Sequence, residues 1–142
     1  MRFVGRMFKV GRYWAIEVPI LGVVTQGRTR KEAFEMVADA IEVLVNKRGF
    51  RVEVFPGDGE YFEVGSANVA ALTALLLRRQ RVKRGLTLSD VTKRMGARSL
   101  NSYARYEQGR SVPSIKRLSQ LLAAVSQGGE FVLVESRGKR VA

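Results

Sequence analysis

The sequence predicts an α+β fold, in which a sheet with one helix comes first and a bundle of helices follows. Alternating apolar residues predict strands on both sides of one amphipathic helix within residues 1–65. Helical spacing, capping residues and glycines then dominate residues 66–128. Charge separates the same regions, because residues 1–65 hold 10 basic and 9 acidic residues, whereas residues 66–142 hold 15 and 4. We therefore expect two domains with different partners.

The whole chain has 142 residues and a formal net charge of +12, with no histidine and no cysteine. These absences exclude thiol nucleophiles, disulfides, Cys/His zinc sites and Ser-His-Asp catalysis. Neither a signal peptide nor the roughly 18–20 consecutive apolar residues of a membrane span is evident. We expect a cytoplasmic protein that is not an enzyme, holds no metal or cofactor, and binds a polyanion.

The first domain, residues 1–65, is expected to have the element order β-β-β-α-β(-β). Its helix begins at a capping box, in which Thr29 and Glu32 each bond through their side chains to the other's backbone. Apolar residues from Ala33 to Val45 follow at helical spacing, and Gly49 lies after the helix end. The strands are predicted at residues 3–10, 13–18, 23–26, 50–55 and 61–64. One helix across a sheet is an α+β layer.

This region resembles the N-terminal domain of HicB antitoxins. The similar residues are Tyr13-Trp14-Ala-Ile-Glu-Val-Pro19, Gly22-Val-Val-Thr25-Gln26-Gly27-Arg28-Thr29 and Glu32-Ala33. The resemblance covers about residues 3–55 and implies a partial RNase H fold that lacks nuclease residues. It also implies a protein partner, an RNA-cleaving HicA-type toxin. The predicted toxin-binding residues are Tyr13, Glu17, Pro19 and Leu21.

A nuclease or RNA-binding protein built on this half is a further hypothesis. Metal-dependent cleavage needs several carboxylates that converge on metal ions. The acidic residues of the predicted helix lie on its polar face, and Glu17, Glu53 and Glu63 occupy outward strand positions. No convergent set results, which argues against this hypothesis.

The second domain, residues 66–128, is predicted to be helical. Two short helices, Leu88–Met95 and Leu100–Gln108, are joined by a turn at Gly96, which is typical of a helix-turn-helix. A longer helix to about Arg84 precedes them, and another opens at Pro113-Ser114. The residues Gly85-Leu86-Thr87, Asp90-Val91, Met95-Gly96, Tyr103, Tyr106-Glu107, Gly109-Arg110, Pro113-Ser114 and Leu118 resemble the Cro/repressor (Xre) family. The resemblance implies binding to double-stranded DNA.

The second helix of such a motif presents its N-terminal residues to the major groove. Tyr103 and Tyr106 are three residues apart, so we expect both in the core, with Asn101 and Arg105 facing outward. Asparagine pairs with adenine and arginine with guanine. The predicted DNA-binding residues are Thr87, Arg98, Ser99, Leu100, Asn101, Ser102, Arg105, Arg110 and Lys116, with Arg117 as a further phosphate contact. The family resemblance also implies an ion pair between Arg81 and Glu107.

Residues 129–142 form the third predicted segment, a strand at Glu130–Glu135 followed by a basic tail. Because one strand is not stable alone, it is expected to join the N-terminal sheet or to pair with a second chain. A homodimer or higher oligomer would match a two-fold operator.

The leading hypothesis is a HicB-like antitoxin that neutralises a HicA-type toxin and represses its own promoter. The alternative is a stand-alone transcriptional regulator whose N-terminal domain oligomerises or senses a ligand. Binding to a membrane surface is a weaker explanation of the charge, because the basic helices show no large free apolar face.

Overall fold

The computed structural model describes residues 1–137. They form two compact units, one of Met1–Asn68 together with the chain from Glu135 onward, and one of Val69–Val134. The last part of the predicted basic tail, residues 138–142, lies outside the described residues. A five-stranded antiparallel sheet followed by helices confirms the predicted α+β class.

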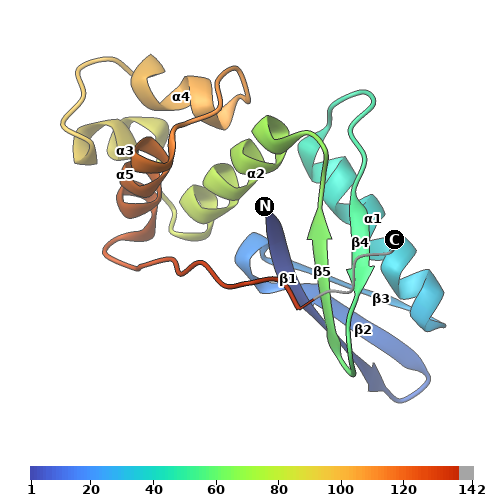
Figure 1. Cartoon of the computed structure of the whole chain (residues 1–142). Coiled ribbons are helices and arrows are strands. Elements are labelled where there is room, and N and C mark those ends of the chain that lie inside the picture. The colour runs from blue at the N-terminus through green and yellow to red at the C-terminus, as the bar shows by residue number, and fades with distance from the viewer. Residues whose placement is uncertain (138–142) are drawn as a thin grey trace. The chain divides into compact units, whose positions relative to one another are not determined.

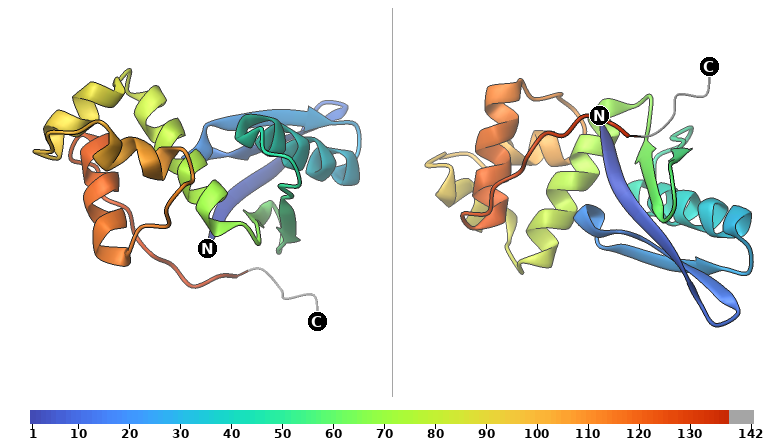
Figure 2. Two further views of the ribbon diagram at one scale, coloured as in Figure 1. Left: turned by 90° about the horizontal axis from the view of Figure 1, so that it is seen from above. Right: turned by 60° about the horizontal axis from the view of Figure 1, so that its bottom comes forward.

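The N-terminal unit has the predicted order of strands and helix. Its elements are β1 (Arg2–Val10), β2 (Tyr13–Val18), the 3-10 helix η1 (Pro19–Leu21), β3 (Val23–Gly27), α1 (Arg30–Val45), β4 (Glu53–Pro56) and β5 (Tyr61–Gly65). The strands lie in the order β3-β2-β1-β5-β4. The helix α1 covers one face of this sheet (Figures 1 and 2).

The core of this unit lies between α1 and the sheet. Alternation along β1 buries Phe3 and Met7 on the helix side. Gly5 lies between them, and a Cβ there would come within 2.1 Å of the Phe62 ring. Because Gly5 leaves this space, the Phe62 ring crosses β1 and meets Phe34 of α1 edge-on, with ring centroids 5.5 Å apart.

The start of α1 differs in one detail from the predicted capping box. Thr29 is the N-cap and its hydroxyl oxygen accepts a hydrogen bond from the Glu32 backbone N–H at 3.0 Å. The Glu32 carboxylate, however, accepts from the backbone N–H of Arg28 at 2.8 Å. The Glu32 carboxylate thus reaches one residue farther back than predicted, to the N–H of Arg28 in place of that of Thr29.

The second unit consists of four helices around one core. The helices are α2 (Val69–Lys83), α3 (Leu88–Arg94), α4 (Asn101–Glu107) and α5 (Ile115–Ser126). Their shared core contains Leu77, Leu86, Val91, Tyr103, Tyr106, Leu121, Ala124 and Val125. These helices match the predicted segments to within one or two residues at most ends.

The strand predicted at Glu130–Glu135 does not join the N-terminal sheet, whereas its pairing with a second chain stays a prediction. Residues 130–137 contain no strand, and the sheet ends at β3 and β4 without them. Val132, Leu133 and Val134 are 82%, 98% and 70% exposed. Strand propensity alone does not form a strand, because the backbone needs a hydrogen-bonding neighbour.

Candidate nucleic-acid interface

The turn between α3 and α4 is built on a glycine in the left-handed conformation. Gly96 has φ +67° and its backbone N–H donates to the Lys93 carbonyl at 3.0 Å. The N–H of Ala97 donates to the Thr92 carbonyl at 3.1 Å. These bonds satisfy the last carbonyls of α3 and end it, as expected for a glycine after a helix. The chain then runs through Arg98, Ser99 and Leu100 into α4.

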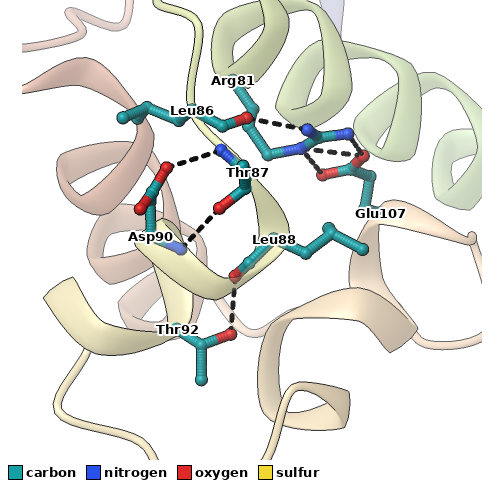
Figure 3. A network of polar contacts seen from close by, with 7 residues as sticks. All are labelled: Arg81, Leu86, Thr87, Leu88, Asp90, Thr92 and Glu107. Carbon is teal, nitrogen blue, oxygen red and sulfur yellow. Dashed lines mark hydrogen bonds and ion pairs between the residues drawn. The ribbon is translucent and has the colours of Figure 1, made fainter.

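The start of α3 is a complete capping box (Figure 3). The Thr87 hydroxyl oxygen accepts from the Asp90 N–H at 3.0 Å, and the Thr87 N–H donates to the Asp90 carboxylate at 2.8 Å. The bond from the Thr87 backbone is the main cause that lowers the pKa of Asp90. Thr87 was predicted as a DNA contact, and the structure shows it as the N-cap of α3.

Arg81 and Glu107 form the ion pair that the family resemblance implied (Figure 3). Arg81 Nε lies 2.9 Å from Glu107 Oε2, and Nη2 lies 2.6 Å from Oε1. Arg81 Nη1 also donates to the Leu86 carbonyl at 2.9 Å. The side chains are only 17% and 7% exposed. The hydrogen bonds to Glu107 raise the pKa of Arg81. One guanidinium thus joins α2, the loop before α3, and α4.

Two tyrosines attach α4 to the core, as their spacing predicted. Tyr103 is fully buried and Tyr106 is 7% exposed. The Tyr103 hydroxyl is buried and makes no hydrogen bond of good geometry with the described residues. Burial, followed by the neighbouring Glu107 carboxylate, raises the pKa of Tyr103. Both rings therefore anchor the helix, and neither is available for stacking on bases.

The opposite side of α4 is exposed. Asn101 and Arg105 are exposed and Ser102 is half-buried, so the predicted base-reading residues lie on the accessible face. Leu100, which is 52% exposed, directly precedes the helix. Ser99, another predicted contact, precedes Leu100 and is exposed. The N-cap position is Leu100, and the Ser99 hydroxyl accepts from the Asn101 N–H at 3.3 Å.

Arg105 does not extend freely from α4. Its Nη2 donates to the Tyr106 hydroxyl at 2.9 Å, and its guanidinium lies 4.7 Å from the centre of the Tyr106 ring. Such a cation–π contact holds the side chain along the helix surface. A contact with guanine would require Arg105 to turn away from Tyr106.

Of the predicted phosphate contacts, Arg110 lies between α4 and α5, and Lys116 and Arg117 lie in the first turn of α5. Ser114 caps this helix by accepting from the Arg117 N–H at 3.1 Å. Arg110 and Lys116 are exposed. Arg117 is half-buried, and its Nη1 donates to Gln120 Oε1 at 3.1 Å. A capped helix start with basic residues beside it is suited to a phosphate oxygen.

The predicted toxin-binding residues of the N-terminal unit fall into two groups. Tyr13, 44% exposed, and the half-buried Glu17 lie on the face of β2 that points away from α1. Pro19 is exposed at the start of η1. Leu21 is fully buried, because η1 turns its side chain into the core. The prediction of Leu21 as a contact residue is therefore wrong, because its side chain is not accessible to a partner.

The described residues offer no metal centre. Within residues 1–137, no group of three or more acidic side chains could hold an ion. Over the same range, no helix has the length and apolar character needed to cross a membrane.

The comparison with protein families agrees with this geometry. Residues 74–130 match a family model described as a helix-turn-helix domain. The match starts within α2 and ends after α5, so it includes the capping box, the Gly96 turn, the ion pair and α4. No curated protein matches the chain. The C-terminal unit of this chain is therefore a helix-turn-helix domain, which marks it as a DNA-binding region.

Proposed function

We propose that the chain is a transcriptional repressor that binds operator DNA through α4 and acts at its own promoter. The observation that carries this proposal is the exposed face of α4. Asn101 and Arg105 lie on it, while Tyr103 and Tyr106 hold the opposite face in the core. Arg and Asn side chains on a groove-sized helix recognise base edges.

Charge supports the same proposal. Residues 69–134 hold 12 basic and 3 acidic residues. Lysine and arginine contacts to phosphates supply most non-specific affinity for DNA and make that affinity salt-dependent. A repressor of this kind acts in the cytoplasm as a dimer or higher oligomer, with one α4 for each half of a two-fold site.

The test is fluorescence anisotropy with a labelled duplex taken from upstream of the chain's own gene, against a scrambled duplex of equal length. We expect tighter binding to the first, and affinity that falls linearly with salt on a logarithmic plot. Asn101→Ala and Arg105→Ala should each weaken binding by roughly 1–3 kcal/mol. Lys47→Ala, which removes an exposed charge of the N-terminal unit, is the matched control. Equal binding of wild type to both duplexes would refute the proposal.

We further propose that the N-terminal unit neutralises a toxin of the HicA type. The support is the exposed part of the sheet at β2 and β3, where Tyr13 and Glu17 lie near Val24, which is 73% exposed and registered opposite Glu17. The element order also agrees with the HicB resemblance. The alternative is a stand-alone regulator whose N-terminal unit oligomerises or senses a ligand.

Co-expression of the chain with a neighbouring protein distinguishes toxin neutralisation from a stand-alone regulator. The probe is any small basic protein encoded beside the chain's gene, tested for RNA cleavage with and without the chain. We expect the wild-type chain to suppress the RNA cleavage. Tyr13→Arg should lose this suppression, and the control variant Arg12→Ala should keep it. A neighbour that cleaves RNA equally in the presence of the chain would favour the stand-alone regulator.

A further inference from the structure

A buried carboxylate in the N-terminal unit has no part in the proposed contacts. Glu63 lies in β5, on the sheet face away from α1, and was expected to point outward into solvent. Its side chain is instead only 3% exposed. The alternation of β5 predicted its face correctly, but Ser136 and Arg137 of the returning chain contact the carboxylate there.

Four donors converge on this carboxylate. Oε1 accepts from Arg2 Nη1 at 3.1 Å and from the Ser136 hydroxyl at 2.5 Å. Oε2 accepts from the Arg137 backbone N–H at 3.1 Å and from the Tyr61 hydroxyl. Two donors therefore come from the strands β1 and β5, and two from the chain that follows the helix-turn-helix domain.

Arg2 is itself held in place. Its guanidinium lies 3.4 Å from the centre of the Phe55 ring, and its Nη1 also reaches Ser136 Oγ at 3.3 Å. Burial by itself would raise the pKa of Glu63, but the hydrogen bonds from Ser136, Tyr61, Arg2 and Arg137 outweigh it and lower the pKa to about 2. The carboxylate is thus charged at neutral pH, and each of its oxygens accepts two hydrogen bonds.

The helix-turn-helix domain is connected to the N-terminal unit by a chain segment at each of its ends. The chain leaves the sheet after Gly65, enters α2 at Val69, and returns to the N-terminal unit at Glu135. At the far end of α5, Gly129 is fixed to Ser126 by two hydrogen bonds, at 3.1 and 2.6 Å. From Gly129 to Ser136 the backbone reaches at most about 25 Å, and from Gly65 to Val69 about 14 Å.

We propose that Glu63 is a positioning residue for the helix-turn-helix domain. It fastens the returning chain to the sheet, so that two short tethers restrict the domain instead of one. Without the Glu63 contacts the second tether ends in solvent and the domain turns about the Ser66–Asn68 linker alone. The consequence for DNA rests on the proposed function: two tethered domains tolerate only a narrow spacing between operator half-sites.

The first test is amide hydrogen exchange at Arg137 by NMR. Glu63→Gln keeps the side-chain size but replaces one acceptor oxygen by a donor that faces other donors. Exchange at Arg137 should become at least about tenfold faster, as expected when a charge-assisted bond is lost. Ser136→Ala, which removes one donor, should give a smaller increase. Glu60→Gln is the control, because Glu60 pairs with Arg6 in an exposed position and makes no contact with the tether.

Amides of the β1–β5 ladder report whether the sheet stays folded. If Glu63→Gln unfolds it, Ser136→Ala carries the test. Unchanged exchange at Arg137 in every variant with a folded sheet would overturn the proposal.

The second test uses the upstream duplex with base pairs inserted between its half-sites. The wild type should bind the lengthened duplexes more weakly, whereas Glu63→Gln should bind them nearly as well as the unaltered duplex. Both proteins should bind the unaltered duplex with equal affinity. Identical spacing profiles would overturn the positioning role. If wild type binds no sequence specifically, the proposed function fails, while the exchange result still decides whether the tether exists.

Discussion

Glu63 in the N-terminal unit and Glu107 in the helix-turn-helix domain have side chains only 3% and 7% exposed, and their two carboxylates are held differently. Glu107 receives three hydrogen bonds from one partner, Arg81, 26 residues away in the chain. Glu63 receives single bonds from Arg2, Tyr61, Ser136 and the Arg137 backbone, up to 74 residues away. A bidentate pair enforces one packing of two helices. With donors from several segments, Ser136 and Arg137 can leave Glu63 while Arg2 and Tyr61 stay bonded to it.

The largest effect should come from breaking the pair in the helix-turn-helix domain. Glu107→Ala leaves Arg81 buried without its partner, and we expect a loss of about 3–5 kcal/mol in the free energy of unfolding. Urea unfolding followed by far-UV circular dichroism measures it. The double variant Arg81→Met, Glu107→Leu should lose less than the two single changes combined. A loss below about 1 kcal/mol in Glu107→Ala would show that the pair does not hold the domain together.

The next largest effect is a pH-dependent contribution of Glu63 to the free energy of unfolding. Burial opposes its charge, but the hydrogen bonds prevail and lower the pKa from 4.5 to about 2. A lowered folded-state pKa adds stability above the unfolded value, and this stability is lost as the pH falls. The stability difference between wild type and Glu63→Gln should therefore be full above pH 4.5 and shrink toward pH 2. A difference that stays constant over this range would contradict the bonding scheme.

The two helix starts offer a matched pair with a smaller effect. Thr29 and Thr87 each accept a backbone hydrogen bond at 3.0 Å, at the starts of α1 and α3. Thr29→Ala and Thr87→Ala should each lower the free energy of unfolding by about 1 kcal/mol, because a backbone donor loses its partner. Serine at either position retains the hydroxyl and serves as the control. Thermal unfolding of the four variants measures the difference, and an alanine variant as stable as its serine counterpart would refute the cap.

The smallest effect is expected at Tyr103. Its buried hydroxyl makes no hydrogen bond of good geometry with the described residues. Tyr103→Phe therefore removes only the interaction of the hydroxyl with the neighbouring Glu107 carboxylate, and it should change stability by less than about 0.5 kcal/mol. The same urea unfolding measures this. A clear loss of stability would contradict this and show that the hydroxyl donates a strong hydrogen bond, to Glu107 or to a bound water.

Much of the helical half could be predicted because its signals are local. The capping box at Thr87, the left-handed Gly96 and the three-residue spacing of Tyr103 and Tyr106 each report on a few neighbouring residues. The Arg81–Glu107 pair was predictable only through the family resemblance. The contact of Arg105 with Tyr106 was not predicted, because side-chain rotamers depend on the folded surface.

The N-terminal half shows where local signals end. Alternation placed Glu63 on the correct face of β5 but not in a buried site, because the covering chain lies more than 70 residues away. Leu21 was expected at a binding surface, and the 3-10 helix turned it into the core. The apolar run at Val132–Val134 has the composition of a strand, but no neighbouring strand pairs with it among the described residues.

The sequence by itself determined the fold class, the order of the elements and the helix-turn-helix, since hydrophobic period, caps and glycines act over a few residues. It also determined the concentration of positive charge in the second half. Only the tertiary structure decided that Glu63 fastens the returning chain. That outcome depends on four donors from three separate segments meeting at one carboxylate, and no local pattern records such a meeting.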